Sequence, residues 1–333
     1  MNKDSSKETK KKMSKKKAVL LVILVLLLAV FTVGAATVTH YINLINHVND
    51  IDTVDPGSEF FDTDSNTEGE VVDPNKVTWD LSGPLGDEHL LNLLLVGQDK
   101  RPGEGRQRSD VMIVASINLE TKSVSLISFM RDLYVQIPGY SDNRLNAAYV
   151  FGGFPLLKDT LYKNFGITID GCFEVDFNGF IKSIDKIGGV DIVLSRAEAN
   201  AIGVAYKGDE PTHLNGEKAL SYARLRKIDS DFGRTDRQKK ILLSAANKLK
   251  SCSVKELISL VNEVLPAITT DMSTTQIYSL VAKAAPLVAS SEIKTFTVPG
   301  SGTYKNVVIR GMQVLLPDLE AVKKMLRESY MPF

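Results

Sequence analysis

The chain has 333 residues, of which 44% are hydrophobic, and its formal net charge is zero at pH 7. This composition is typical of a globular protein and excludes a disordered or collagen-like chain. The net charge of zero arises from an uneven distribution of charged residues along the chain. Residues 1–17 carry eight lysines and two acids, residues 18–41 carry no charge, and residues 42–88 carry twelve acids and one lysine.

The uncharged block predicts a transmembrane anchor. Its 22 residues 18–39 are mostly Leu, Val, Ile and Ala, and a helix of that length crosses the ~30 Å hydrocarbon core of a bilayer. The positive-inside rule then assigns residues 1–17 to a cytoplasmic basic tail, residues 18–40 to the anchor and the following residues to the outside of the cell membrane. A signal peptide cleaved near residues 33–35 is the alternative, although the apolar run is longer than a signal peptide requires.

Residues 41–88 are predicted to form an acidic extracytoplasmic stalk. They are rich in Asp, Glu, Asn, Gly and Pro, and such a segment buries too little apolar area to order itself. Its like charges favour an extended linker between the membrane and the following domain.

Residues 89–333 are predicted to form one α/β domain, because strand and helix patterns alternate along them. Short apolar runs predict strands at 91–98, 111–118, 123–129, 172–177, 190–194, 293–300 and 306–310. Longer periodic runs, several of them stopped by glycine, predict helices at 146–153, 154–166, 178–189, 215–226, 234–250, 254–264, 274–287 and 316–329. The turn between 118 and 123 makes an antiparallel hairpin, so the predicted fold is a layered domain with helices on both faces of a mixed sheet.

The first group of candidate site residues lies in the loop 97–110, which joins two predicted strands. Asp99 and Asp110 flank this loop, and its closure as a hairpin would bring their carboxylates together. Two hard oxygen ligands suit Mg²⁺ or Mn²⁺. A solvated loop of paired Asp and Arg side chains is the simpler alternative.

The second group lies in the basic stretch 222–240. Arg234 and Gln238 share one face of a helix, whereas Arg224 and Arg226 can face one ligand only if their helix ends near them. Arginine binds phosphate oxygens in a bidentate manner and stays charged. A solvated basic helix face remains the alternative.

Several classes of function lack support in the sequence. None of the four histidines lies near a Gly-x-Ser-x-Gly motif or a cysteine nucleophile, and there is no Walker motif. Cys172 and Cys252 do not form a Cys-x-x-Cys pair, and two buried thiols are favoured over a disulfide. Nucleic acid is a poor partner for a domain outside the cell. A phosphate ester or pyrophosphate at the membrane is then the anion that best suits several arginines and a metal.

The order and the sequences of these clusters resemble those of the LytR–CpsA–Psr family of bacterial cell-wall ligases. The matching segments lie in family order within residues 91–250: "LLVGQDKR", "RSDVMIVAS", "LISFMRDLYVQIPG", "RLNAAYVFGG", "GCFEVDFNGFIKSIDKIGGVDI" and "LNGEKALSYARLRKIDSDFGRTDRQKKIL". Three positions depart from the family pattern. Met130 stands where many members have Pro, and Gln98 and Lys100 stand where small polar residues are common.

The resemblance implies a membrane-anchored phosphotransferase of a Gram-positive-type bacterium. Its substrate would be an anionic glycopolymer, a teichoic acid or capsule-type polysaccharide, linked to undecaprenyl pyrophosphate, and its acceptor would be peptidoglycan. It also implies a three-layer α-β-α domain with an apolar groove for the prenyl chain.

The resemblance assigns roles residue by residue. Asp99 and Asp110 match metal-associated carboxylates for Mg²⁺ (or Mn²⁺), and Asp99 is the candidate base. The expected catalytic arginines are Arg108, Arg131 and Arg226. The expected pyrophosphate contacts are Arg101, Arg108, Arg131, Asn146, Arg224, Arg226, Arg234, Arg237 and Gln238. A polyprenyl-pyrophosphate phosphatase and a non-catalytic prenyl-phosphate-binding regulator remain as alternatives.

Overall fold

The structure is a computed structural model. It describes residues 39–40, 43–47, 53, 55, 61, 63–65, 67–79, 83–85, 89–98, 106–225, 228–251, 265–277, 279–280, 283 and 291–331. The chain divides into two compact units, residues 1–43 and residues 44–333. Most of the predicted anchor and the predicted helix at 254–264 therefore lie outside the described residues. Among the helices that are described, none has both the length and the apolarity needed to cross a membrane.

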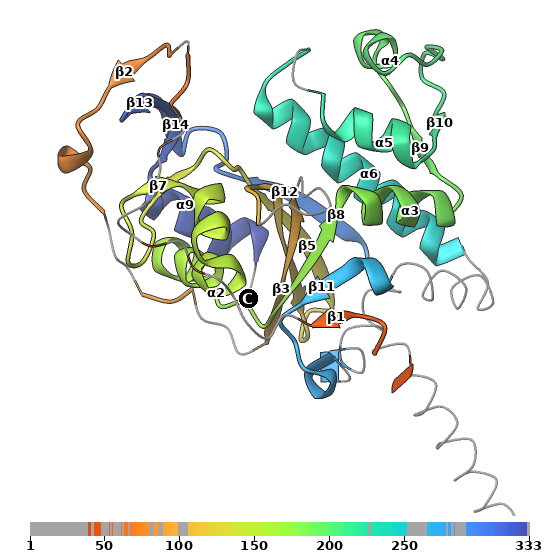
Figure 1. Cartoon of the computed structure of the whole chain (residues 1–333), viewed down its shortest axis with the longest axis horizontal. Coiled ribbons are helices and arrows are strands. Elements are labelled where there is room, and N and C mark those ends of the chain that lie inside the picture. Colours follow the sequence, from red (N-terminus) through yellow and green to blue (C-terminus); the bar gives the residue numbers. More distant parts are fainter. Residues whose placement is uncertain are drawn as a thin grey trace, which may run out of the picture. The chain divides into compact units, whose positions relative to one another are not determined.

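The second unit is built on a mixed sheet, as predicted (Figure 1). In the described part of the chain its strand order is β1–β11–β8–β3–β4–β5–β12. Strands β3, β4 and β5 pair antiparallel, whereas β8 runs parallel to β3 and β12 runs parallel to β5. The strands are β1 (Asn46–His47), β11 (Ile268–Thr270), β8 (Gly171–Asp176), β3 (Leu90–Gln98), β4 (Ser109–Asn118), β5 (Ser123–Phe129) and β12 (Ile293–Val298).

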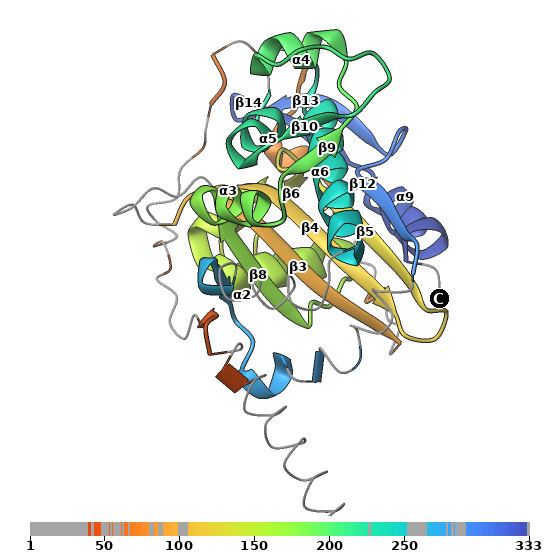
Figure 2. The same cartoon turned by 90° about the vertical axis from the view of Figure 1, so that its right-hand side faces the viewer.

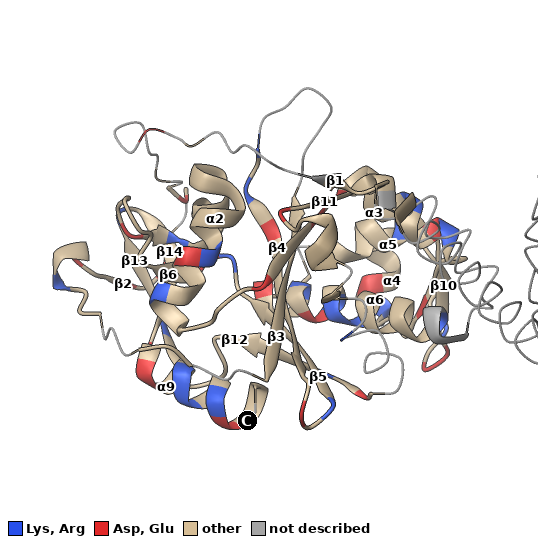
Figure 3. Ribbon diagram, turned by 90° about the horizontal axis from the view of Figure 1, so that it is seen from below, with Lys and Arg blue, Asp and Glu red and all other residues tan. Residues whose placement is uncertain are grey.

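Helices cover both faces of this sheet, which gives the predicted three layers (Figures 1 and 2). One face is covered by α2 (Leu145–Phe165) and α9 (Leu319–Met325), which continues as a π-helical turn over Leu326–Tyr330. The other face is covered by α3 (Phe177–Lys186), α5 (Gly216–Ala223) and α6 (Asp231–Ser251). Figure 3 shows both acidic and basic residues on α9, as expected for a helix with one solvated side.

Smaller elements surround the three layers. A small lobe with its own apolar cluster contains β9 (Val190–Ile192), α4 (Arg196–Ile202) and β10 (Thr212–Leu214). A three-stranded sheet contains β2 (Glu70–Val71), β13 (Tyr304–Ile309) and β14 (Met312–Pro317), and a short pair contains β6 (Tyr134–Val135) and β7 (Asn143–Arg144). Two 3₁₀ turns, η2 (Pro74–Lys76) and η3 (Leu265–Ala267), complete the described elements.

Side-chain alternation along the strands separates the core from a cavity. Leu94 and Val96 of β3 point into the main core beneath α2, so Leu95 and Gly97 point to the opposite face, where they line a cavity. The helix pattern on the core side is interrupted at Gly152 and Gly153, and Gly153 has a φ of 60° that favours glycine. The prediction of two helices, each stopped by glycine, is confirmed at this kink.

The expected stalk differs from the structure, because described parts of residues 41–88 pack on the domain. Strand β2 pairs with β13, Leu85 is buried in the main core, and Trp79 packs against Tyr134. The indole of Trp79 also donates to Asp142 over 2.9 Å. The acidic composition misled the prediction, since a few apolar side chains and backbone hydrogen bonds suffice to hold a segment on an existing core.

Candidate active site

The cavity lies between the sheet and the helices α3, α5 and α6. It has a volume of about 320 Å³, and most of its lining is apolar, with Phe173, Phe177 and Leu242 among the lining residues. Five polar side chains line it as well: Asp110, Asp176, Arg224, Arg234 and Gln238. The structure therefore brings together four residues that the sequence singled out from two distant segments.

A β-bulge explains how Asp110 reaches this cavity. Gly97 of β3 pairs with Val111 of β4, but the next residue, Gln98, pairs with Ser109. Asp110 is thus the extra residue of the bulge, and a bulge redirects a side chain from the face that the alternation would give it. The strands pair up to Gln98 and Ser109, as the hairpin prediction required, while Asp99 and Arg101 lie outside the described residues.

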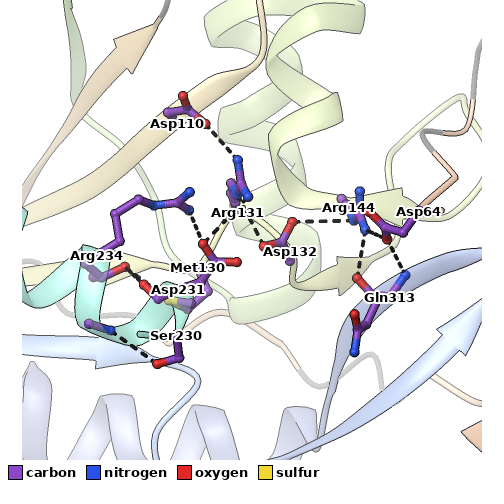
Figure 4. A network of polar contacts seen from close by, with 12 residues as sticks. Asp64, Asp110, Met130, Arg131, Asp132, Arg144, Ser230, Asp231, Arg234 and Gln313 are labelled. Atoms are coloured by element: carbon purple, nitrogen blue, oxygen red, sulfur yellow. Dashed lines mark hydrogen bonds and ion pairs between the residues drawn. The ribbon is translucent and has the colours of Figure 1, made fainter. Parts of the chain in front are cut away.

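Arg131 lies at the centre of the polar network drawn in Figure 4. Its guanidinium contacts three carboxylates: Asp110 at 3.0 Å, Asp132 at 3.3 Å and Asp231 at 3.6 Å. Burial acts to lower the pKa of Arg131, but the three carboxylates outweigh burial and raise the pKa above its ordinary value. Arg131 therefore keeps its charge and its orientation in a partly buried place.

Backbone contacts fix Arg131 at the end of β5. The amide of Met130 donates to Val298 O of β12 over 2.8 Å, and the amide of Asn146 donates to Arg131 O over 3.3 Å. Met130, the residue that departs from the family pattern, is buried, and its sulfur accepts a hydrogen bond from Thr235 of α6. The side-chain oxygen of Asn146 is buried without a hydrogen-bond partner among the described residues.

Arg234 extends the network from α6 to the cavity. Its side chain is only 5% exposed, and its Nη2 lies 2.9 Å from Asp231. The Nε and Nη1 atoms are buried and lack a hydrogen-bond partner among the described residues. Burial lowers the pKa of Arg234, and the positive charge of Arg131 adds to this effect. Two buried N–H groups without acceptors are costly, and an anion in the cavity would satisfy them.

Arg224 lines the cavity, and Arg108 lies close in sequence to the lining residue Asp110. Helix α5 ends at Ala223, so Arg224 follows the helix and its guanidinium lies over the ring of Phe177, with 4.4 Å between the carbon Cζ and the ring centroid. The expected helix end near these arginines is thus observed, whereas Arg226 lies outside the described residues. Arg108 is half-buried directly before β4, two residues ahead of Asp110.

Arg237 is placed differently from the expectation that it contacts the ligand. It does not line the cavity, and its guanidinium, 1% exposed, binds both oxygens of Asp229 at 2.7 and 2.9 Å. The Nη2 atom also donates to Leu225 O over 2.6 Å. Burial acts against its charge, yet the hydrogen bonds to Asp229 outweigh burial and raise the pKa of Arg237. Arg237 therefore braces the loop between α5 and α6.

The sequence analysis assigned no role in the site to Asp132, Asp231 and Arg144, which belong to this network. Burial raises the pKa of Asp132, while Arg131 and, less strongly, Arg144 act in the opposite direction. An Arg-Asp pair directly after a predicted strand is more often structural than functional, so the position of Asp132 beside Arg131 did not indicate a role in the site. Nothing local to the sequence indicates that Arg144 lies 3.4 Å from Asp132.

The described carboxylates allow a metal but do not by themselves form a metal site. Among the residues that the structure places, no group of three His, Cys, Asp or Glu side chains could hold a metal ion. The three carboxylates Asp110, Asp132 and Asp231 are contacted by three arginines, Arg131, Arg144 and Arg234, so the charges of this group balance. A Mg²⁺ ion is commonly held by one or two carboxylates and by substrate phosphates, so Asp110 fits as one ligand.

Comparison with known proteins identifies the family. Residues 58–329 match the sequence model of the LytR_cpsA_psr family. The chain belongs to this LytR–CpsA–Psr family. The match begins within the expected stalk, in agreement with the packing of that segment on the LytR–CpsA–Psr domain.

Relatives of this LytR–CpsA–Psr protein carry two kinds of names. The chain is 32% identical over 230 residues to the regulatory protein MsrR of Staphylococcus aureus strain COL. This match covers 68% of this chain and 69% of the relative. It is 34% identical over 233 residues to the polyisoprenyl-teichoic acid–peptidoglycan teichoic acid transferase TagU of Oceanobacillus iheyensis. This match covers 66% of this chain and 70% of the relative.

Solved structures confirm the fold. TagV of B. subtilis is 29% identical with a TM-score of 0.57, and the match covers 74% of this chain and all of that chain. TagT bound to LI-WTA is 25% identical with a TM-score of 0.59, and the match covers 73% and 91%. The mixed α/β domain predicted from the sequence is thus the LytR–CpsA–Psr fold.

Proposed function

We propose that this enzyme, a transferase, moves an anionic glycopolymer from a polyprenyl-pyrophosphate carrier to peptidoglycan at the outer face of the cell membrane. The relatives named as teichoic acid transferases support the reaction class. The cavity is the observation that supports this best. It is mostly apolar, and it is lined by Arg234, whose buried Nε and Nη1 atoms lack acceptors among the described residues. A ligand with an apolar chain and an anionic head suits both parts.

The apolar lining favours a prenyl chain. A volume of about 320 Å³ lies within the range of small-molecule pockets, so the cavity is suited to the part of a long chain that adjoins the head group. Burial of apolar surface contributes about 25 cal/mol per Å². The chain would therefore supply binding energy that holds the pyrophosphate against the arginines.

The arginines would act on the pyrophosphate mainly through charge and position. Arg131, Arg234 and Arg224 are fixed by carboxylates or by an aromatic ring before the ligand arrives, so little reorganisation is needed when charge develops. Arg108, Arg226 and Arg101 would join them. When bound to Asp110 and Asp99, Mg²⁺ or Mn²⁺ would offset the negative charge of the pyrophosphate.

The transfer step exchanges one P–O bond for another. The oxygen of a peptidoglycan hydroxyl attacks the phosphorus next to the glycopolymer and forms a new P–O bond. The bond from that phosphorus to the bridging oxygen breaks, and prenyl monophosphate leaves. Asp99, as the candidate base, takes the proton of the hydroxyl. Arg131 and Arg234 stabilise the charge on the leaving phosphate.

A reconstituted assay tests the proposal. The full-length protein is mixed with lipid-linked glycopolymer and peptidoglycan, and the products are separated by size and by lipid content. Ligated polymer supports the transferase. Free polymer phosphate without ligation indicates a phosphatase instead, and lipid binding without any product indicates a regulator, a possibility that the name of MsrR keeps open.

A further inference from the structure

A chain of charges connects the acidic segment ahead of the domain to Arg131. Arg144, the residue that precedes α2, is buried and forms an ion pair with Asp64. On its other side Arg144 lies 3.4 Å from Asp132, which contacts Arg131. Figure 4 shows Arg144 between Asp64 and Asp132, on the side of Arg131 away from Asp110.

Asp64 is itself fixed by backbone contacts. Its carboxylate accepts from the amide of Gln313 over 2.7 Å, and its own amide donates to Gly311 O over 3.0 Å. Arg144 in turn donates to Gln313 O over 2.8 Å. Asp64 and Arg144 thus both bind the backbone of Gln313 in β14, which fixes the position of Arg144.

The neighbouring backbone links this cluster to the same end of the site. The amide of Leu315 donates to Asp132 O over 2.9 Å. Asp132 is only 15% exposed beside Arg131, and a second cation stabilises its charge, because Arg131 is shared among three carboxylates. Arg144 is the second arginine in contact with Asp132.

We propose that Asp64 and Arg144 are positioning residues that hold Asp132, and through it Arg131, in the geometry that receives the pyrophosphate. The acidic segment then contributes to the geometry of the site through Asp64, in addition to linking the domain to the preceding residues. This inference deepens the proposed function and rests on it for the role of Arg131 as a pyrophosphate contact.

The first test needs no substrate. Hydrogen exchange of the full-length protein is followed by mass spectrometry in peptides that span residues 130–146. Loss of one charged hydrogen bond in Asp64→Asn should speed exchange there about tenfold. Glu70→Gln is the matched control, because it makes the same charge change in the same segment on an exposed side chain. Equal exchange in the two variants would overturn the proposal.

The second test separates positioning from stability. Asp64→Asn and Arg144→Gln should each raise the KM for the lipid-linked glycopolymer about tenfold and leave the KM for peptidoglycan unchanged. A general loss of folded protein lowers kcat and moves neither KM. The double variant should have the same donor KM as Arg144→Gln, since both changes interrupt the same series of ion pairs. Asp64→Glu should recover part of the lost affinity for the donor.

Gln313→Ala is a further control and should leave the donor KM unchanged, because Gln313 contacts Asp64 and Arg144 through its backbone. If the wild type transfers polymer and Asp64→Asn keeps its KM for the lipid-linked donor, the positioning role fails. If exchange accelerates in Asp64→Asn while the wild type transfers nothing, the link to Arg131 is supported and the proposed transferase reaction is what fails.

Discussion

Arg131→Gln should both stop transfer and destabilise the domain, and the destabilisation should depend on pH. The change removes the cation that three carboxylates share. Asp110 and Asp132 lie within hydrogen-bond range, and a hydrogen bond to a charged group contributes about 1.5–3 kcal/mol. Asp231, farther away and more exposed, adds less than about 1 kcal/mol.

Because Arg131 and its partners remain partly exposed, we expect a net loss of about 3 kcal/mol in the free energy of unfolding at pH 7.5. For a domain of this size about 1 kcal/mol corresponds to 2–4 °C in Tm, so the Tm should fall by about 6–12 °C. Turnover should fall at least about 10³-fold, the order associated with an arginine that stabilises phosphoryl transfer.

The sign of the pH dependence follows from Asp132. Burial holds its folded-state pKa above the ordinary value, so the folded state gains stability as the pH falls toward that pKa. Arg131 acts to lower this pKa, and its removal raises the pKa further. Protonation of Asp132 then relieves the variant, and the difference in Tm between wild type and variant should be smaller at pH 5 than at pH 7.5.

Thermal unfolding at the two pH values, followed by circular dichroism, measures the effect. Arg196→Gln is the control, because Arg196 is exposed and stacks on Tyr206, a contact that contributes about 0.5–1 kcal/mol. A Tm of Arg131→Gln equal to that of the control, or a Tm difference that does not change with pH, would refute the description of Arg131 as a shared cation.

Three further predictions concern other parts of the site. Arg237→Lys should destabilise the domain by about 2–4 kcal/mol in urea unfolding, because lysine cannot make the bidentate contact to Asp229; an unchanged midpoint would contradict its bracing role. Val175→Phe should weaken binding of geranylgeranyl pyrophosphate about tenfold or more, because Val175 lines the cavity, while Val71→Phe on an exposed edge strand should not. Asp99→Ala should lose transfer at every Mg²⁺ concentration if Asp99 is the base; activity restored by high Mg²⁺ would leave it a metal ligand only.

Local patterns predicted the central elements closely. The predicted strand at 123–129 coincides with β5, because an apolar run bounded by a charged turn and by Arg131 has clear ends. Strand β14 was missed, and its last residues were assigned to the final helix, since Leu316 and Pro317 directly precede the helix cap Asp318. A short strand next to a strong helix signal leaves no local pattern of its own.

The candidate site could be predicted only where its residues follow strand ends or share a helix face. Asp110, Arg234 and Gln238 have such positions, and they line one cavity. The contact of Asp64 with Arg144 joins residues 80 positions apart, and no periodicity encodes a contact of that kind. Arg237 shares a helix with Arg234, but tertiary contacts to Asp229 decide where its side chain lies.

The strand order of the central sheet has a consequence for biosynthesis. Its strands β8 and β5 are covered by β11 and β12, which are contributed by residues 268–270 and 293–298. A nascent chain that has emerged only to residue 250 therefore presents two uncovered strand edges, which readily pair with other chains. The site is also incomplete at that stage, because Met130 beside Arg131 is held by Val298. We therefore expect folding of this domain to be completed only when nearly the whole polypeptide has been made.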